Sequence, residues 1–545
     1  MGKLRFTLTS VLFWMVLVLS CFLSENYALF VSNPSAGLSL QSASLLTACL
    51  LILLVVYYVF EHKNNKIGFD KILLPCLIFL GIMMILNIFR QENRTLLSLD
   101  GSKEITVTYS FLDKFIAVSQ VVVWLSAIYA IVFVSNRFMV SKESFRWLAK
   151  AYWAFIIISI IIDLFYESSK VSEVFTSPWY QKGLEFIFGN GNVWAFLVVI
   201  GILSALVLST QKFYLPYYIS MVLMTLYLFL TKSSTCLVLS IFIVFAYSLY
   251  EIISLFKTNK KRATVLLMVL SGAVLAAISF VLIFINVDAL AKTKIGSLLR
   301  GLFLDKRFDS FSGRTNIWKG IISILKENPL DLFLGLGHGT GNKLFRLIAN
   351  DGYSFYGGLK SAHNGFMEIL LRYGILGLVI YALLLCLIVF CFVLHIRKKN
   401  YRFAFIYGLV FIAVMLHSIV ESTILFTPNI EGLYIGLVFA LPVLNILHSK
   451  HFDGLKESLE KEEVAKEKIK GQTVLMSFVF VAISIFVTKI VSIFVAIDLF
   501  SSLIILITLL LLSLIIVDII CKNNINNVVL FEFKKRALRN NNYEK

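Results

Sequence analysis

Long apolar runs alternate with short polar loops along most of this chain. Each run of about 20 residues is long enough to cross a hydrocarbon core of ~30 Å as a helix. The pattern therefore predicts an all-α polytopic membrane protein with about 12 core transmembrane helices and about 2 more near the C-terminus. We place these spans at 7–23, 39–60, 72–89, 115–135, 147–165, 186–209, 213–230, 235–255, 264–286, 375–394, 403–422, 431–447, 473–489 and 499–520.

The short loops differ sharply in their content of Lys and Arg. Every second loop is basic, and the loops between them carry few positive charges, as in 24–38, 166–185 and 423–430. By the positive-inside rule the basic loops and both termini are cytoplasmic. The basic loops are Met1–Arg5, His62–Lys71, Arg137–Lys150, Lys257–Arg262, His395–Arg402 and His448–Lys470.

One long segment, residues 287–374, interrupts the alternation. It is polar and aromatic, and the sidedness of the spans makes it a large extracytoplasmic loop within a membrane body of residues 1–447. A charged stretch at 448–471 predicts a cytoplasmic linker. It leads to a two-helix membrane unit at 472–521 and a cytoplasmic tail at 522–545.

An amphipathic helix is predicted over 315–327 within the extracytoplasmic loop. It is too short and too polar to span a membrane. We expect it to lie along the outer membrane interface with Trp318 as its anchor, and Asn328-Pro329 to end it. Its apolar positions are Ile317, Trp318, Ile321, Ile322 and Leu325.

The composition excludes a soluble domain, because 59% of the residues are hydrophobic and only 15% are charged. The formal net charge of +18 suggests nucleic acid at first sight, but basic loops beside anionic lipid explain it, and no nucleic-acid partner is expected. The 7 cysteines show no metal-ligand spacing. Neither a metal nor a cofactor is predicted.

The extracytoplasmic loop is unusually basic, with 11 Lys and Arg against 6 Asp and Glu between Asp288 and His363. Contact with lipid headgroups and binding of an anionic substrate both explain this charge. Arg314 opens the predicted helix, where a guanidinium beside free backbone N–H groups suits a phosphate or diphosphate; a lipid phosphate is the alternative ligand. The alternating glycines around His338, from Gly335 to Gly341, lack the setting of a nucleotide motif and predict close backbone packing.

His363-Asn364 is the strongest local signal in the loop. A helical segment follows with a Glu368/Arg372 pair at i,i+4, and then Gly374 and Gly377 permit a bend or a close helix contact. A histidine at the mouth of a span is commonly an interfacial polar group. Here it faces a cationic, water-accessible surface, which favours acid–base or phosphate chemistry.

Ionisable side chains within the spans are also functional candidates, because they are costly in lipid. His417 and Glu421 are one turn apart near the outer end of their span, and Asp163 and Glu167 are spaced likewise. Satisfaction by pairing within the bundle is the alternative for each.

Several motifs together resemble the O-antigen ligase and polymerase family of bacterial membrane glycosyltransferases. His-Asn followed after nine residues by Gly-x-x-Gly is similar to the family signature. Gly313-Arg314-x-x-x-Trp318, Asn-Pro-Leu at 328–330 and Gly-x-Gly at 335–337 resemble the outer loop of that family in the same order and spacing. The segment Gly189–Ala195 is similar to the glycine/asparagine segment that opens a middle span in the family. The resemblance covers roughly residues 185–445.

The resemblance implies transfer of a glycan from a polyprenyl-diphosphate carrier at the outer face of the bacterial cytoplasmic (inner) membrane. Lipid-linked oligosaccharides and membrane lipids are the implied partners, with a chain-length regulator and a flippase of the same pathway as candidates. The resemblance implies that Arg314 and His363 handle the diphosphate or the acceptor. Glu421, or His417 with it, is our candidate to accept the proton of the acceptor hydroxyl. Substrate-binding roles are predicted for Lys232, Asn192, Trp318, His338, Asn364, Arg372 and His417.

Two departures from the family pattern bear on the function. Ser234 stands where the family often has an arginine, and Lys232 beside it supplies a charge without a bidentate fork. The ligase-type Thr-Thr is absent, since Leu378-Val379 follow the second glycine. We therefore favour a polymerase of repeat units for capsule, exopolysaccharide or O-antigen. A ligase that moves finished glycan to a lipid, protein or wall acceptor is the alternative, and a polysaccharide flippase is the third.

Overall fold

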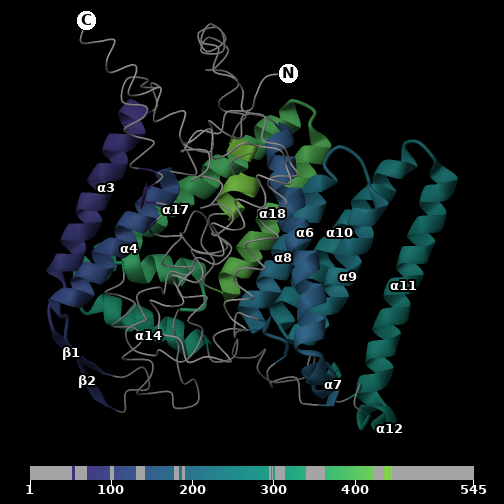
Figure 1. The fold of residues 1–545 in the computed structure, drawn as a ribbon, viewed down its shortest axis with the longest axis horizontal. Helices are drawn as coiled ribbons and strands as arrows, with labels where there is room; N and C mark the ends of the chain where they lie inside the picture. Colours follow the sequence, from purple (N-terminus) through teal and green to yellow (C-terminus); the bar gives the residue numbers. More distant parts are fainter. Residues whose placement is uncertain are drawn as a thin grey trace, which may run out of the picture. The chain divides into compact units, whose positions relative to one another are not determined.

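The computed structural model describes residues 70–97, 103–129, 142–176, 183–186, 191–293, 314–338, 362–421, 434–440 and 442–444, together with the isolated positions 49, 52, 53, 55, 296, 299 and 300. These residues are mostly helical (Figure 1). The chain divides into two compact units: unit 1 comprises 1–151, 316–399 and 421–545, and unit 2 comprises 152–315 and 400–420.

Helices occupy the predicted spans that fall within the described residues. They are α3 (Asp70–Arg90), α4 (Phe111–Tyr129), α6 (Lys142–Tyr166), α8 (Gly191–Leu208), α9 (Leu215–Thr231), α10 (Ser234–Phe256), α11 (Lys260–Asn286), α17 (Gly365–Arg397) and α18 (Tyr401–Val420). Among the described residues, 7 helices are long and apolar enough to cross a membrane, and α9 and part of α3 form shorter apolar helices. The protein is therefore a multi-pass membrane protein.

Other predictions concern residues outside the described ranges. The spans at 7–23, 473–489 and 499–520, the linker at 448–471 and the tail at 522–545 lie there, as does nearly all of 39–60. Of the predicted span 431–447, the structure describes a π-helical turn at Ile435–Ala440 and a few neighbouring residues. The total of about fourteen spans thus stays a prediction.

Unit 1 contains a β-hairpin that the all-α prediction missed. Strands β1 (Arg94–Leu97) and β2 (Glu104–Val107) pair antiparallel, with Thr95 opposite Thr106. Alternate residues of β2 are buried, so the hairpin presents one apolar face. Only four residues form each strand, and such a short period-2 pattern is easily overlooked between long apolar helices.

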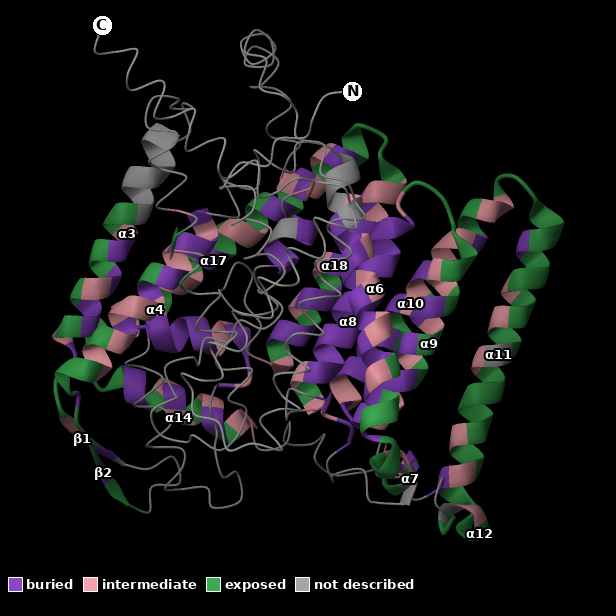
Figure 2. Ribbon diagram, in the orientation of Figure 1, coloured by how far each residue is buried: buried purple, intermediate pink, exposed green. Residues whose placement is uncertain are grey.

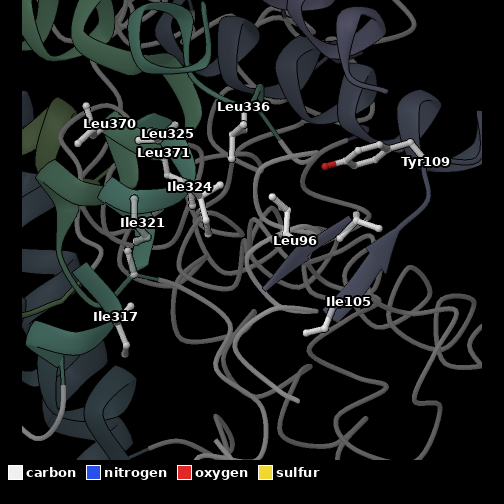
Figure 3. Packing of buried hydrophobic residues seen from close by; sticks show 12 residues of the cluster. Leu96, Ile105, Tyr109, Ile317, Ile321, Ile324, Leu325, Leu336, Leu370 and Leu371 are labelled. Atoms are coloured by element: carbon white, nitrogen blue, oxygen red, sulfur yellow. The ribbon is translucent and has the colours of Figure 1, made fainter. Parts of the chain in front are cut away.

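The apolar faces of the hairpin and of α14 (Arg314–Lys326) meet in one hydrophobic cluster of unit 1. Figure 3 shows the aliphatic side chains of α14 close to Leu370 and Leu371 of α17, with Leu96 and Ile105 reaching in from the hairpin. The expectation that this face of α14 lies on the membrane interface is therefore wrong. It packs against protein, because the hairpin and α17 supply an apolar surface that the sequence pattern alone did not reveal.

Unit 2 is built around α8, whose residues are buried from Trp194 to Leu208. This helix packs on α9, α10 and α18, and Figure 2 shows it buried along almost its whole length. The small Gly201 lets Ile156 of α6 approach the backbone, since a Cβ there would lie 2.9 Å from the Ile156 side chain. A helix that is apolar on all sides is typical of the centre of a bundle.

Candidate functional site

The helix α17 begins at a well-defined turn that carries His363. Asn364 is its N-cap, and the Asn364 Oδ1 accepts hydrogen bonds from the backbone N–H groups of Phe366 and Met367 at 2.9 and 3.0 Å. His363 itself has a φ of 48°, in the left-handed region. Residues other than glycine adopt this region at a cost, and such strain persists where the surroundings impose it.

Both backbone polar groups of Ala362, the residue before His363, are hydrogen-bonded to side chains. The Ala362 N–H donates to Glu368 Oε2 at 2.9 Å, and the Ala362 carbonyl accepts from Trp318 Nε1 at 3.0 Å. Ala362 is fully buried. The indole N–H of Trp318 is therefore used within unit 1, while its ring packs beside the hydrophobic cluster.

Glu368 and Arg372 form the ion pair that their i,i+4 spacing predicts. Arg372 donates from Nε at 2.9 Å and from Nη2 at 2.6 Å to Glu368 Oε1. Both side chains are buried, with exposures of 4% for Arg372 and 1% for Glu368. The guanidinium is thus occupied inside the protein, and this geometry favours a framework role over direct contact with a substrate.

The imidazole of His363 meets a carboxylate from a distant part of unit 1. His363 Nδ1 lies 2.9 Å from Glu421 Oε2, and the two side chains are 30% and 18% exposed. A carboxylate on Nδ1 favours the tautomer with its proton there and leaves Nε2 as the basic nitrogen. A partly exposed histidine oriented in this way can exchange a proton with a bound hydroxyl group.

Two glycines cross at a break in α17. Gly374 interrupts the helix with φ 63° and ψ −160°, and Gly335 follows α15 (Pro329–Leu334) with a φ of 75°. A Cβ on Gly335 would lie 2.4 Å from the Tyr373 backbone N, and one on Gly374 would lie 2.4 Å from backbone atoms of Phe333. Only glycine fits at either position, as the prediction of a bend and close packing required.

The break leaves carbonyl groups of α17 without helical partners, and the segment after α15 satisfies them. Leu336 N–H donates to the Leu371 carbonyl at 2.8 Å, and Gly337 N–H donates to the Arg372 carbonyl at 3.1 Å. This pairing brings His338 beside Tyr373. The glycines thus serve backbone packing, which was the simpler interpretation of the motif.

His338 is buried and forms a short hydrogen bond between its Nδ1 and the Tyr373 hydroxyl. The Tyr373 ring stacks on Trp124 at a centroid distance of 5.7 Å. Burial, and secondarily the nearby Arg372 charge, lower the pKa of His338 well below its ordinary value. The imidazole is therefore neutral at physiological pH, which allows hydrogen bonding but not the binding of an anion by charge.

A cationic cluster that sequence reasoning missed lies where α3, β1 and α15 meet. The buried Asp331 carboxylate accepts from Arg90 Nη2 and from Arg94 Nη1, each at 2.7 Å. Arg90 and Asn87 also donate to the Gly335 carbonyl, each at 3.2 Å. The sequence shows Arg90 and Arg94 after the end of a predicted span and, far along the chain, Asp331 after Asn-Pro. No local pattern indicates that these side chains pair.

In unit 2, the two motif segments around Asn192 and Lys232 lie side by side. A Cβ on Gly191 would be 3.1 Å from the Thr231 carbonyl oxygen, and Leu184 N–H donates to the Leu230 carbonyl at 3.0 Å. Asn192 is exposed in the first turn of α8. The structure thus brings these two motif segments together within this unit.

Lys232 ends α9 in a left-handed conformation, with a φ of 56°. It is only 8% exposed, and burial lowers the pKa of its ammonium group. A partly desolvated lysine at a helix end is a stronger partner for an anion than a fully hydrated one. Lys232 and His363, both predicted site residues, thus each have a positive φ.

The remaining predicted residues of unit 2 have different surroundings. His417 is buried and stacks on Phe196, with ring centroids 3.5 Å apart. Arg314 is half-buried in the first turn of α14. The stacking of His417 favours a packing role, whereas Arg314 keeps the position at a helix start from which its candidate role was inferred.

The two carboxylates of α6 and its C-terminal end accept hydrogen bonds from protein groups, although Asp163 Oδ1 is buried without a hydrogen-bond partner among the described residues. Asp163 Oδ2 accepts from Trp194 Nε1 at 3.2 Å and from the Tyr227 hydroxyl. Glu167 accepts from Lys170 Nζ at 2.5 Å and from the backbone N–H of Glu185 at 2.9 Å. Pairing within the bundle, the alternative to a functional role, thus holds for these contacts.

Unit 1 therefore gathers His363, Glu421, Asn364, Trp318 and Arg372 around one turn, with His338 on the neighbouring segment. The other four predicted residues, Arg314, Lys232, Asn192 and His417, belong to unit 2. Within the part of the chain that the structure describes, no group of three or more His, Cys, Asp or Glu side chains could hold a metal ion.

Comparison with known proteins finds a family model that matches part of the chain. Residues 219–382 match the family model Wzy_C, described as O-antigen ligase. The matched range contains the Lys232 segment, α14, the Gly335 crossing and the His363 turn, so the motif-based resemblance is confirmed. A search of curated proteins found no match.

Proposed function

We propose that this multi-pass membrane protein, which carries an O-antigen ligase domain at residues 219–382, transfers glycans in the assembly of bacterial surface polysaccharide. The donor is an oligosaccharide repeat unit on a polyprenyl diphosphate at the outer face of the cytoplasmic membrane. Polymerisation of repeat units is the favoured reaction. The single observation that carries the chemistry is the 2.9 Å contact between His363 Nδ1 and Glu421 Oε2.

In the proposed reaction, a hydroxyl oxygen of the acceptor sugar attacks the anomeric carbon of the donor glycan. The bond from that carbon to the diphosphate oxygen breaks, and the lipid diphosphate leaves with the electron pair. The proton of the attacking hydroxyl passes to His363 Nε2. Glu421 orients the imidazole and stabilises the positive charge that develops on it.

Charge stabilisation of the departing diphosphate is assigned to Arg314 and Lys232. Arg314 offers a guanidinium at the start of a helix, where backbone N–H groups also favour an anion. Lys232 offers an ammonium group in a partly desolvated setting. Both assignments rest on the chemistry of the residues and on the family resemblance.

The test is conversion of lipid-linked repeat units by the purified protein in liposomes. We expect His363→Ala and Glu421→Gln to lower turnover by about 10²- to 10⁴-fold, the usual contribution of a general base. Arg314→Ala should lower turnover by about 10²-fold. Arg262→Ala, which alters an exposed arginine at the start of α11, is the control and should keep wild-type turnover. Full turnover in both His363→Ala and Glu421→Gln would refute the assigned chemistry.

Ligation is the second candidate function, because the matching family model is described as O-antigen ligase. The products of the same assay separate the two reactions. A ladder of lipid-linked chains that differ by one repeat unit indicates a polymerase. Transfer of a preformed chain onto an added lipid, protein or wall acceptor, without a ladder, indicates a ligase.

A further inference from the structure

The turn that carries His363 depends on two side chains that bind the backbone of a single residue, Ala362. Trp318 Nε1 binds the Ala362 carbonyl at 3.0 Å, and Glu368 Oε2 binds the Ala362 N–H at 2.9 Å. The two contacts come from different elements, α14 and α17. Trp318 restrains the peptide that joins Ala362 to His363, and Glu368 restrains the peptide that precedes Ala362. On the other side of His363, Asn364 is fixed as the N-cap of α17.

Such restraint is what a histidine with a positive φ requires. A φ of 48° is unfavourable for a residue with a side chain and persists only where the surroundings impose it. The chain would relax from this conformation if the flanking peptide could rotate. Relaxation would redirect the imidazole away from Glu421, because the Cα–Cβ direction follows φ.

Glu368 is itself held in place. Arg372 occupies its Oε1 with two hydrogen bonds, so Oε2 is directed at Ala362. On the other side, the Trp318 ring packs beside the cluster formed by α14, the hairpin and α17. Trp318 and Glu368 are therefore held rigidly by their own neighbours. A residue that changes conformation to contact a substrate would not need such fixed surroundings.

We propose that Trp318 and Glu368 are positioning residues, which act on the glycan-transfer reaction by holding His363 in its left-handed conformation against Glu421. This inference rests on the proposed function and gives Trp318 a role different from membrane anchoring or substrate binding. A substrate-binding residue changes KM when it is altered. A positioning residue changes kcat and leaves the KM values of donor and acceptor nearly unchanged.

Trp318→Phe is the sharpest variant, because it deletes the indole N–H and keeps an aromatic ring in the cluster. We expect kcat to fall by roughly three- to tenfold, the range that the loss of one buried hydrogen bond allows. Both KM values should stay within about twofold. The matched control is Trp153→Phe, which deletes an indole N–H bound to Ser220 Oγ at 2.8 Å in unit 2 and should leave kcat unchanged.

Glu368→Gln supports the same measurement, since its side-chain carbonyl can still accept from Ala362 N–H. It should lose less kcat than Glu368→Ala, and this rescue by the conservative variant separates positioning from general loss of structure. Melting temperatures of the detergent-purified variants check that each remains folded.

A double-mutant cycle decides whether Trp318 acts through the His363–Glu421 pair. In a Glu421→Gln background, Trp318→Phe should cost less than twofold in kcat, because the orientation it maintains no longer matters. A full, additive loss in that background, or a rise in KM without a fall in kcat, overturns the positioning role. Unchanged kcat in Trp318→Phe alongside an inactive His363→Ala overturns this inference and leaves the proposed function intact. Full turnover in both His363→Ala and Glu421→Gln overturns both.

Discussion

At the scale of single residues, the positions predicted to carry chemistry divide into partly exposed groups and buried ones. His363 and Glu421 are partly exposed and touch each other. Arg372 and His338 are buried, and their polar atoms meet protein partners. The sequence could indicate that these residue types stand at the mouth of a span, but it could not separate the reactive group from its supports, because burial depends on the whole fold.

The buried His338 predicts a pH dependence of stability. Its folded-state pKa is lowered by burial, so the unfolded chain, with a pKa near the ordinary ~6.5, binds this proton more readily. Stability from this residue is therefore fully present above about pH 6.5 and is lost as the pH falls toward the lowered folded value. Melting temperatures of purified protein between about pH 5 and pH 8 should fall on the acid side, and His338→Gln should flatten that decline. An unchanged slope in the variant would contradict this prediction.

At the scale of elements, the helices were largely predictable and their connections were not. Apolar periodicity located α3, α4 and α8 to within several residues, because crossing a membrane demands a long apolar run. The hairpin escaped notice, although Asp100-Gly101 between Arg94–Leu97 and Glu104–Val107 is a turn signal. Contacts between residues far apart in sequence, such as the pair of His363 and Glu421, have no local signature.

The cluster around Asp331 ties three elements together and predicts a large loss of stability when its charge is removed. Asp331→Asn should lower the free energy of unfolding by about 3 kcal/mol, because Arg90 and Arg94 would lose their buried partner. Their partial exposure, 27% and 21%, keeps the loss from being larger. Chemical denaturation in detergent measures it.

The matched control for this variant is Asp288→Asn. That carboxylate is 92% exposed and lies 3.8 Å from Arg300, so solvent screens the pair and the melting temperature should not change. Equal losses in the two variants would contradict the role of the Asp331 cluster.

At the scale of the whole molecule, the function depends on sidedness. The Lys- and Arg-rich loops predict that α14 lies outside the cell and that the turn between α17 and α18 lies inside. If this orientation were reversed, α14 would lie in the cytoplasm, away from the lipid-linked donor proposed at the outer face.

Cysteine labelling of intact cells tests the orientation. In a background without the 7 native cysteines, Lys319→Cys on α14 should react with a membrane-impermeant maleimide. Lys398→Cys, between α17 and α18, should react only after the membrane is permeabilised. Both positions are exposed, so access to the reagent depends on the side of the membrane. The reverse labelling pattern would place α14 on the cytoplasmic side and contradict a donor at the outer face.

The interruption of α17 at Gly374 has a mechanical consequence. Before it, the carbonyl groups of Leu371 and Arg372 accept hydrogen bonds from Leu336 and Gly337, whereas the residues after it form the predicted membrane span. Bilayers differ in thickness, and a spanning helix adapts by tilting. Rotation of the backbone at Gly374 allows the residues after it to tilt with the surrounding lipid. The residues before it, and His363 that precedes them, then keep their position against Glu421.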